Sequence, residues 1–382
     1  MRAATLLALI PMAAGLPSVQ RQAPVLVPRG GNQIDGKYIV RMKNNAMSTA
    51  VDSAISSITA KADYTYSRGF SGFAASLTPE ELEKLKSNPN VDYIEQDAIV
   101  TIQATQEDAP WGLARISSKE PGGTTYTYDD TAGEGICAYV LDTGIDVDHE
   151  EFEGRATWLE NFSGDGSDED GHGHGTHCAG TIGSKTYGVS KKASLFAVKV
   201  LDANGSGSNS GVIKGMEYVA GDAPSREGCD KGSVVNMSLG GSFSQSVNDA
   251  AAAIVDAGIF LAVAAGNEAA NAADSSPASE PKACTVGASD NADAIAEFSN
   301  FGKLVDVFGP GVDIESTVPG GTDTMSGTSM ASPHVAGFGA YLLGKGESIE
   351  GLCETIAKTA IQVITGAPNG TTTGLINNGE DA

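Results

Sequence analysis

The sequence predicts an α/β protein made of two folded units. We expect a small ferredoxin-like α+β unit over residues 36–103, followed by a larger unit over residues 104–382 in which helices cover both faces of a parallel sheet. A β-α-β-β-α-β succession predicts the first unit, and a longer alternation of apolar strands with helical segments predicts the second. A break in charge near residue 103 separates them, since residues 1–103 hold 10 of the 24 basic and only 9 of the 48 acidic residues.

Composition excludes several classes of protein. With 382 residues and 41% hydrophobic content, the chain can bury a core, so global disorder is excluded. The net charge of −24 repels phosphate backbones and anionic lipids. We therefore expect neither nucleic acid nor a membrane as a partner.

The first residues predict a signal peptide, over residues 1–15. Arg2 gives a short basic start, and a mostly apolar run of small residues leads to Gly15. That run is too short to span a bilayer. We expect a secreted, extracellular protein in which residues 16–35, with their Pro, Arg and Gly, form a linker.

The elements of the first unit follow in order. Periodicity and turn residues predict a strand, a helix, a hairpin, a helix and a strand over residues 37–42, 47–60, 64–77, 78–87 and 91–102. The second helix has the clearest start, because Thr78 suits the N-cap, Pro79 the first helical position and Glu81 the third.

The second unit alternates strands and helices. Apolar strands are expected over residues 136–141, 195–201, 234–237 and 259–264, and helices over residues 174–183, 209–220 and 246–257. In such folds, active sites gather at the carboxyl ends of the strands. That is where functional side chains should be sought.

Three short segments carry candidate chemistry, in the order Asp, His, Ser. Asp142 directly follows an apolar strand, and His174 lies between glycines at the start of a predicted helix. Ser329 lies at a Gly-led helix start, where backbone N–H groups point toward developing negative charge.

These segments resemble the subtilisin-like serine proteases, and more closely the proteinase K-like branch found in fungi. Further matching segments lie at residues 109–117, 152–155, 263–267, 277–281 and 298–300. The resemblance covers residues 104–382 nearly end to end and implies a subtilisin-like catalytic domain there. Residues 36–103 resemble the family's inhibitory propeptide, so the propeptide as a whole would span residues 16–103. The resemblance thus implies a secreted serine endopeptidase made as a self-processing zymogen.

The resemblance also implies the role of each residue. Ser329 would attack the scissile carbonyl, His174 would take its proton, and Asp142 would orient the imidazole. Asn267 would form the oxyanion hole with the backbone N–H of Ser329. Substrate would pair as an added strand with two segments, and apolar or aromatic side chains would be preferred at P1, the residue whose carbonyl is attacked. The implied substrate-binding residues are Gly205, Ser206, Gly207, Ser238, Leu239, Gly240, Ala265, Gly266, Leu201, Asn209 and Val212.

Five cysteines leave at least one thiol unpaired within the chain. The resemblance implies the disulfides Cys137–Cys229 and Cys284–Cys353, with Cys178 as a free thiol.

The resemblance further implies a structural calcium ion and no catalytic cofactor. The backbone carbonyls of Pro281 and Ala283 and the carboxylate of Asp306 would supply the hard oxygen ligands that calcium prefers. Self-cleavage would fall between Gln103 and Ala104. We expect a monomer whose partners are protein or peptide substrates and its own propeptide, which acts as intramolecular chaperone and inhibitor.

Two alternatives belong to other classes. His172, His174 and His177 have a spacing that allows a metal-dependent hydrolase. A non-catalytic secreted inhibitor or binder is the other, but no candidate catalytic position carries an incompatible residue.

Overall fold

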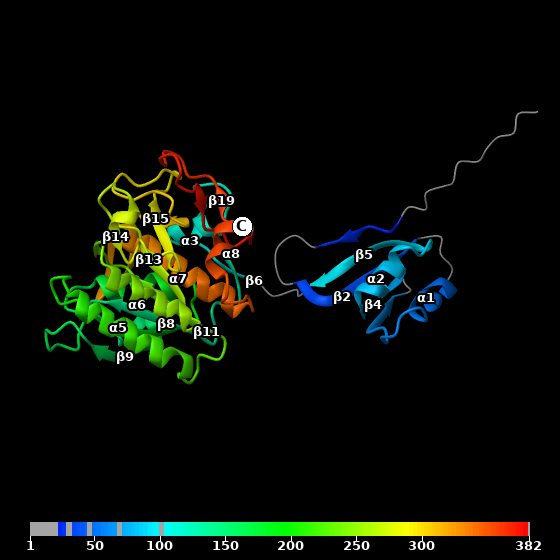
Figure 1. Ribbon diagram of the computed structural model, residues 1–382, viewed down its shortest axis with the longest axis horizontal. Coiled ribbons are helices and arrows are strands. Elements are labelled where there is room, and N and C mark those ends of the chain that lie inside the picture. Colours follow the sequence, from blue (N-terminus) through cyan, green and yellow to red (C-terminus); the bar gives the residue numbers. More distant parts are fainter. Residues whose placement is uncertain (1–21, 28–32, 44–47, 67–70, 99–102, 381–382) are drawn as a thin grey trace, which may run out of the picture. The chain divides into compact units, whose positions relative to one another are not determined.

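The computed structural model describes residues 22–27, 33–43, 48–66, 71–98 and 103–380. The predicted signal peptide, half of the predicted linker and residues 99–102 lie outside the described residues. The chain divides into two units, residues 1–100 and 101–382, which are treated separately below (Figure 1). None of the described helices is long and apolar enough to cross a bilayer.

The first unit has the predicted ferredoxin-like arrangement. Its elements are β1 (Val25–Leu26), β2 (Gln33–Met42), α1 (Ser48–Ile55), β3 (Tyr64–Tyr66), β4 (Gly72–Ser76), α2 (Pro79–Lys86) and β5 (Val91–Ala98). The sheet order is β1-β5-β2-β4-β3, with β2 antiparallel to both β4 and β5. Regular structure begins before residue 36, because β2 starts at Gln33 and β1, in the predicted linker, pairs with β5.

Helix α2 begins where the sequence predicts. The backbone N–H of Glu81 donates to the Thr78 hydroxyl at 3.3 Å, and the Glu81 carboxylate accepts from the Thr78 backbone N–H at 2.9 Å. These reciprocal bonds satisfy two N–H groups that the helix itself leaves without partners.

The second unit is built on a nine-stranded sheet. Its strands are β8 (Ile136–Asp142), β9 (Ala156–Asn161), β10 (Ser194–Lys199), β11 (Gly232–Met237), β13 (Phe260–Ala264), β15 (Cys284–Ser289), β16 (Val307–Pro310), β19 (Ile361–Gln362) and β20 (Gly374–Leu375). They lie in the order β19-β20-β16-β15-β13-β11-β8-β10-β9. Every neighbouring pair is parallel except β19 with β20, so the predicted parallel sheet is confirmed.

Helices and three small two-stranded sheets surround it. The helices are α3 (Trp111–Ile116), α4 (His174–Gly183), α5 (Asn209–Asp222), α6 (Gln245–Asp256), α7 (Thr328–Gly344) and α8 (Leu352–Thr359). The small sheets pair β6 (Gln103–Gln106) with β7 (Tyr126–Asp129), β12 (Gly241–Ser242) with β14 (Ser275–Ser276), and β17 (Ile314–Val318) with β18 (Gly321–Met325).

Strand β8 shows why the sheet has helices on both faces. It is buried along its whole length, and its alternate side chains enter two different cores. Ile136, Ala138 and Val140 pack in the core that contains α4 and α7. Tyr139 and Leu141 pack on the other face with α5 and α6 (Figure 1). A strand buried on both faces is hydrophobic throughout rather than alternating.

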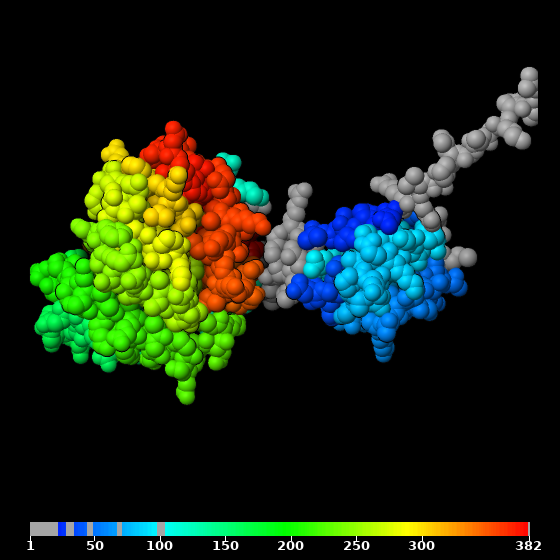
Figure 2. All heavy atoms as spheres, in the orientation of Figure 1, coloured from blue at the N-terminus to red at the C-terminus, as the bar shows by residue number. Residues whose placement is uncertain are grey.

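Both predicted disulfides are present, and Cys178 is the free thiol. Cys284–Cys353 ties α8 to the start of β15, and the α8 segment, orange to red in Figure 2, lies against the yellow part of the chain. Each bridge closes a long loop and so restricts the unfolded chain.

Candidate active site

Asp142 ends strand β8, at the carboxyl edge of the sheet. Its side chain is fully buried, and its Oδ1 accepts two hydrogen bonds, from the Thr143 backbone N–H and from His174 Nδ1, each at 2.7 Å. Because Oδ1 can only accept from the imidazole, Nδ1 carries a proton, and the Nε2 atom of neutral His174 is left as the acceptor.

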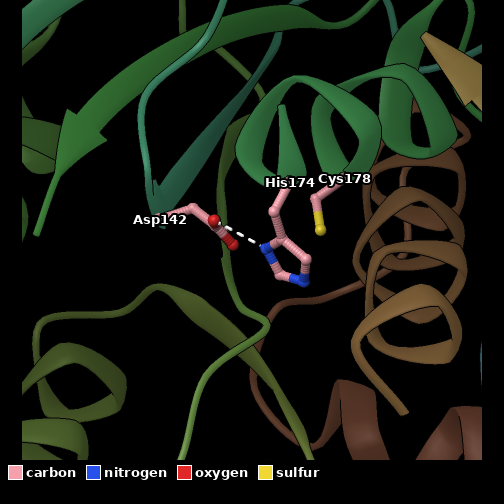
Figure 3. Close-up of side chains that lie close together, drawn as sticks. All are labelled: Asp142, His174 and Cys178. Atoms are coloured by element: carbon pink, nitrogen blue, oxygen red, sulfur yellow. Dashed lines mark hydrogen bonds and ion pairs between the residues drawn. The ribbon is translucent and has the colours of Figure 1, made fainter. Parts of the chain in front are cut away.

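His174 is the first residue of α4, and the local sequence fixes it against β8. Gly173 caps the helix with a φ of +93°. At Gly175, a Cβ atom would lie 2.1 Å from the Gly144 carbonyl oxygen. Only glycine permits this approach of the helix to the loop after Asp142. In Figure 3, Asp142 reaches His174 from the end of its strand, while His174 and Cys178 project from one helix.

A buried polar network holds the turn after Asp142. The Thr143 hydroxyl donates to Asp170 Oδ1 at 2.7 Å and accepts from the Gly175 backbone N–H at 2.9 Å. The fully buried Lys199 donates to the Thr143 carbonyl at 2.7 Å and pairs with Asp165 at 3.2 Å. Strand β10 therefore supports the end of β8 through a side chain as well as through its backbone.

Opposing influences act on the pKa of His174. Burial disfavours the charged imidazolium and lowers the pKa. The charge of Asp142, its hydrogen bond to the ring and the more distant charge of Asp170 raise it, and the net pKa lies above the ordinary value of 6.5. The arrangement therefore stabilises a proton on this imidazole.

Ser329 lies in the first turn of α7 and is tied to both neighbouring elements. Its hydroxyl donates to the Ser238 carbonyl at 3.3 Å, and its own carbonyl accepts from the Ser238 hydroxyl at 2.7 Å and the Cys178 thiol at 3.4 Å. The start of α7 is thus fixed to α4, which carries His174, and to the end of β11.

Asn267 follows β13 at the same edge of the sheet. Its Oδ1 accepts from the backbone N–H of Thr328 at 2.8 Å and from the Thr328 hydroxyl at 2.9 Å. Since the side-chain oxygen is engaged by the residue before Ser329, the amide NH₂ remains as a donor beside the serine. Asn267 and Ser329 line one cavity.

Comparison with known proteins decides the family. Residues 133–373 match the subtilase family and residues 37–103 match the peptidase inhibitor I9 family. The chain belongs to the subtilase family. It is 52% identical to the cuticle-degrading protease of Metarhizium anisopliae over 99% of this chain and 100% of the relative. It is 65% identical to proteinase T of Parengyodontium album over 76% of this chain and 99% of the relative. A crystal structure of a cold adapted subtilisin-like serine proteinase matches with a TM-score of 0.66 and 39% identity, over 71% of this chain and 99% of that one.

This subtilase is a serine protease with an N-terminal inhibitory propeptide domain. The metal-hydrolase alternative is not supported by the family match, and two of its three histidines have other partners. His177 Nε2 donates to the Ile314 carbonyl at 2.9 Å, and burial lowers the pKa of His177 to about 4. His174 Nδ1 is held by Asp142, and His172 is exposed. The non-catalytic alternative is not supported either, since these relatives are named as proteases or proteinases.

Cys178 lies with Asp142 and His174 in a compact group whose possible ligand atoms are within 4.8 Å of one another (Figure 3). Burial raises the pKa of this thiol well above its ordinary value, and the charge of Asp142 raises it further. The thiol therefore stays protonated and serves the subtilase as a donor to the Ser329 carbonyl.

The predicted substrate-binding residues gather in two adjoining cavities of about 370 and 470 Å³. Leu239 and Gly240 line both. The smaller cavity adds Ala265, Gly266 and the residues around Ser329; the larger adds His174 and the other predicted residues, which are Leu201, Gly205, Ser206, Gly207, Asn209, Val212 and Ser238.

Sequence reasoning missed two carboxylates in these cavities, and it named His172 only as a candidate metal ligand. Glu268 and Asp274 line the smaller cavity with Ser329, and His172 lines the larger one, with its ring centroid 6.2 Å from that of His174. The position of Glu268 directly after Asn267 was an available signal for this side chain. Asp274 offered no such signal, because β12 and β14 bring it in from another part of the chain.

The residues predicted for calcium binding and for propeptide cleavage lie apart from this site. Pro281, Ala283 and Asp306 line a third cavity, of about 290 Å³, beside α8. Gln103 and Ala104 lie in β6, where Ala104 pairs with Tyr128 of β7.

Proposed function

We propose that Asp142, His174 and Ser329 are the catalytic residues of this serine protease, and that it acts as a secreted, monomeric endopeptidase. The observation that carries the proposal is the 2.7 Å bond between Asp142 Oδ1 and His174 Nδ1, in an edge-of-sheet site that also holds Ser329 and Asn267.

Each residue has a distinct task in peptide hydrolysis. His174 Nε2 accepts the proton of the Ser329 hydroxyl as its oxygen attacks the substrate carbonyl, after the hydroxyl leaves the Ser238 carbonyl to which it now donates. Asp142 holds the imidazole in the required tautomer and stabilises the imidazolium. His174 then delivers the proton to the leaving amine, and water hydrolyses the acyl-enzyme by the same steps in reverse.

The tetrahedral intermediate needs donors for its oxyanion. The amide NH₂ of Asn267 and the backbone N–H of Ser329, at the start of α7, supply them, and the bonds from Thr328 keep the amide turned the right way. Donors fixed in advance stabilise the developing charge without reorganisation.

Substrate binds as an extended strand. Residues 205–207 and 238–240 line the larger cavity and pair with the peptide backbone on its two sides. Main-chain pairing tolerates many sequences, which gives broad specificity. Leu239, Ala264 and Ala265 line the smaller cavity and favour apolar or aromatic P1 side chains.

The propeptide is removed by self-cleavage between Gln103 and Ala104. In the described structure these residues belong to β6, which pairs with β7. Strand β7 is anchored to α7, because the Asp129 backbone N–H donates to the Tyr341 hydroxyl at 2.9 Å. Tyr341 lies twelve residues after Ser329 on α7, or about 18 Å along the helix. If the chain's own active site cuts the bond between Gln103 and Ala104, strand β6 must either form only after the cut or open before it.

A structural calcium ion binds at Asp306. Burial raises the pKa of this carboxyl to about 6, against the opposing hydrogen bond from the Thr285 backbone N–H at 2.8 Å. A half-buried carboxylate is the kind of group that calcium stabilises, and Pro281 and Ala283 of the same cavity offer backbone oxygens. The sulfur atoms near Asp306 belong to the Cys284–Cys353 disulfide and do not compete for the ion.

The test combines a serine-directed phosphonate with cleavage profiling on a peptide library. The expected result is loss of cleavage after treatment, labelling of Ser329, and no labelling of Ser329→Ala. Cleavage that persists at full rate after treatment would refute the assignment. Loss of activity with a chelator would not bear on it, because the proposed calcium is structural.

A further inference from the structure

The chain contains four Asn-X-Ser/Thr sequences, which is the acceptor pattern for N-linked sugars. They begin at Asn161, Asn204, Asn236 and Asn369. An N-linked sugar is bulky and hydrophilic, so a folded protein accommodates it only where the asparagine side chain faces open solvent. The surroundings of the four side chains therefore decide which of them can carry one.

Two of the four side chains are built into the fold. Asn236 of β11 is fully buried, its Nδ2 donates to the Ser238 hydroxyl at 2.9 Å, and its Oδ1 accepts from the Ser332 hydroxyl at 2.7 Å. The Nδ2 atom of Asn161 lies within hydrogen-bond distance of three oxygen atoms, the nearest being the Ser167 carbonyl at 2.9 Å. A sugar would replace one N–H group of either amide and displace the neighbours that surround it.

Asn204 is exposed, but it lies in the substrate cleft. It lines the larger cavity together with His174, and it directly precedes residues 205–207, which are proposed to pair with the substrate backbone. A sugar on Asn204 would fill the space that a peptide has to enter. An active protease therefore has no sugar at this position.

Asn369 has the surroundings that a sugar requires. It lies between β19 and β20, in a turn closed by the Thr371 backbone N–H, which donates to the Pro368 carbonyl at 3.1 Å. Asn369 and both its neighbours are exposed, and among the described residues none forms a hydrogen bond with its side chain. Gly370 has a φ of +88°, and a Cβ atom added there would meet only Lys303 Cγ, at 4.0 Å. The turn therefore has open space around it.

The turn is also remote from the candidate active site. Strand β20, which follows the turn, is separated from β8, which ends at Asp142, by five strand spacings in the sheet. At about 4.8 Å each, these amount to about 24 Å. A sugar on Asn369 would thus leave the substrate cleft open.

We propose that Asn369 is a site of N-glycosylation, and that it is the only one of the four asparagines that carries a sugar. Asn369 Nδ2 forms a bond to the anomeric carbon of an oligosaccharide held on a lipid pyrophosphate. The bond from that carbon to the pyrophosphate oxygen breaks, the lipid pyrophosphate leaves, and the amide nitrogen gives up one proton. The inference rests on the proposed secretion of the chain, because sugars of this class are added to secreted proteins.

The test maps sugars on the full chain made in a fungal host, with residues 1–15 exchanged for the host's own secretion signal. The chain carries Ser329→Ala to prevent self-digestion. An amidase that releases N-linked sugars converts each modified asparagine to aspartate, and in heavy-oxygen water it leaves an isotope label there. Peptide mass spectrometry then examines all four positions in one sample. We expect the label at Asn369 and at none of the other three.

Three threonine variants supply the controls. Thr371→Ala removes the hydroxyl that the acceptor sequence requires and should abolish the label, whereas Thr371→Ser should keep it. Thr372→Ala is the matched control, because it removes the adjacent hydroxyl, which lies outside the acceptor sequence, and it should keep the label. An unlabelled Asn369 in the parent chain, a label that persists in Thr371→Ala, or a label at any other asparagine would overturn the inference.

This design separates the inference from the proposed function, because the map needs neither the predicted signal peptide nor a working triad. The active protease then gives a second measurement. Removal of the sugar under native conditions should leave kcat/KM for a small peptide unchanged, since the turn lies away from the cleft. A several-fold rise in kcat/KM would place a sugar in the cleft, as at Asn204, and would overturn the inference.

Discussion

As the proposed general base, the imidazole of His174 should set the pH range in which the protease works. It must be neutral to accept the Ser329 proton, and Asp142 raises its pKa above 6.5 against the opposing effect of burial. Activity is therefore lost as the pH falls through this raised pKa and is regained as it rises. We expect the acid limb of log kcat/KM to have its midpoint above pH 6.5, measured with a neutral peptide. A flat profile from pH 5 to 9 would contradict this.

Asp142→Asn tests the origin of that midpoint. The substitution removes the charge that raises the pKa of His174 and leaves burial to lower it. The acid limb should move to lower pH while kcat falls by about 10⁴-fold, because the amide favours the wrong tautomer. A variant with lower kcat but an unmoved acid limb would show that Asp142 has only a structural effect on His174.

As the proposed oxyanion donor, Asn267 would act through its amide NH₂ group, whereas its Oδ1 atom accepts from Thr328. Asn267→Asp keeps the Oδ1 acceptor used by Thr328 but loses the NH₂ group. We expect kcat to fall by about 10²- to 10³-fold for both Asn267→Asp and Asn267→Ala, with KM changed little, since the oxyanion exists only after attack. If Asn267→Asp kept full kcat, the side chain would not be an oxyanion donor.

At the scale of elements, the approach of α4 to the end of β8 brings together the proposed catalytic pair, Asp142 and His174. Gly175→Ala would bring a Cβ atom within 2.1 Å of the Gly144 carbonyl oxygen. We expect a loss of about 2–3 kcal/mol in the free energy of unfolding, together with reduced kcat as His174 moves. Gly221→Ala on α5 is the matched control, because its Cβ meets nothing within 4 Å, and it should be neutral or slightly stabilising. Denaturant unfolding in a Ser329→Ala background, which prevents self-digestion, measures both.

Lys199 couples strands β8 and β10 below the site. Its ammonium is fully buried between the Thr143 carbonyl and Asp165, so Lys199→Met or Asp165→Asn leaves one partner without its counter-charge. Asp165→Asn should cost about 3 kcal/mol because it leaves the buried ammonium unpaired. Lys199→Met should cost less because the remaining Asp165 is exposed, and the double variant should cost clearly less than the sum. In contrast, breaking the exposed Lys214–Glu217 pair of α5 should cost less than about 0.5 kcal/mol. Additive effects for Lys199 and Asp165 would show that the two do not interact.

The elements were predictable where local signals agreed with the fold. Helix α2 starts at its Thr78 capping box, and β8 was visible because a strand buried on both faces is apolar throughout. Asp142 and His174 stood out as a strand end and a glycine-flanked helix start, and the family resemblance then paired them. Local signals did not predict features that depend on pairing between distant segments. Strand β1 lies in the predicted linker and forms only by pairing with β5. Asp274 lies beside the β12–β14 pairing, which joins two segments far apart in the sequence.

At the scale of the molecule, the proposed calcium ion ties stability to pH. Asp306 has a pKa of about 6 in the folded protease, raised by burial from an ordinary value of 3.8. Because the folded state binds this proton more tightly, the metal-free protein should lose stability as pH rises from about 4 to 6. Calcium replaces the proton as the partner of the carboxylate, so its stabilising effect should grow over the same range.

Thermal unfolding of the full chain carrying Ser329→Ala measures this directly. The rise in Tm on adding calcium should be small at pH 4.5 and large at pH 7.5, and chelation should lower Tm mainly at the higher pH. Asp306→Asn should remove most of the calcium effect at both pH values, since an amide cannot be ionised and binds the ion weakly. The exposed Glu350→Gln should leave it intact. A calcium effect equal at the two pH values and unchanged in Asp306→Asn would place the ion, if one binds, elsewhere in the molecule.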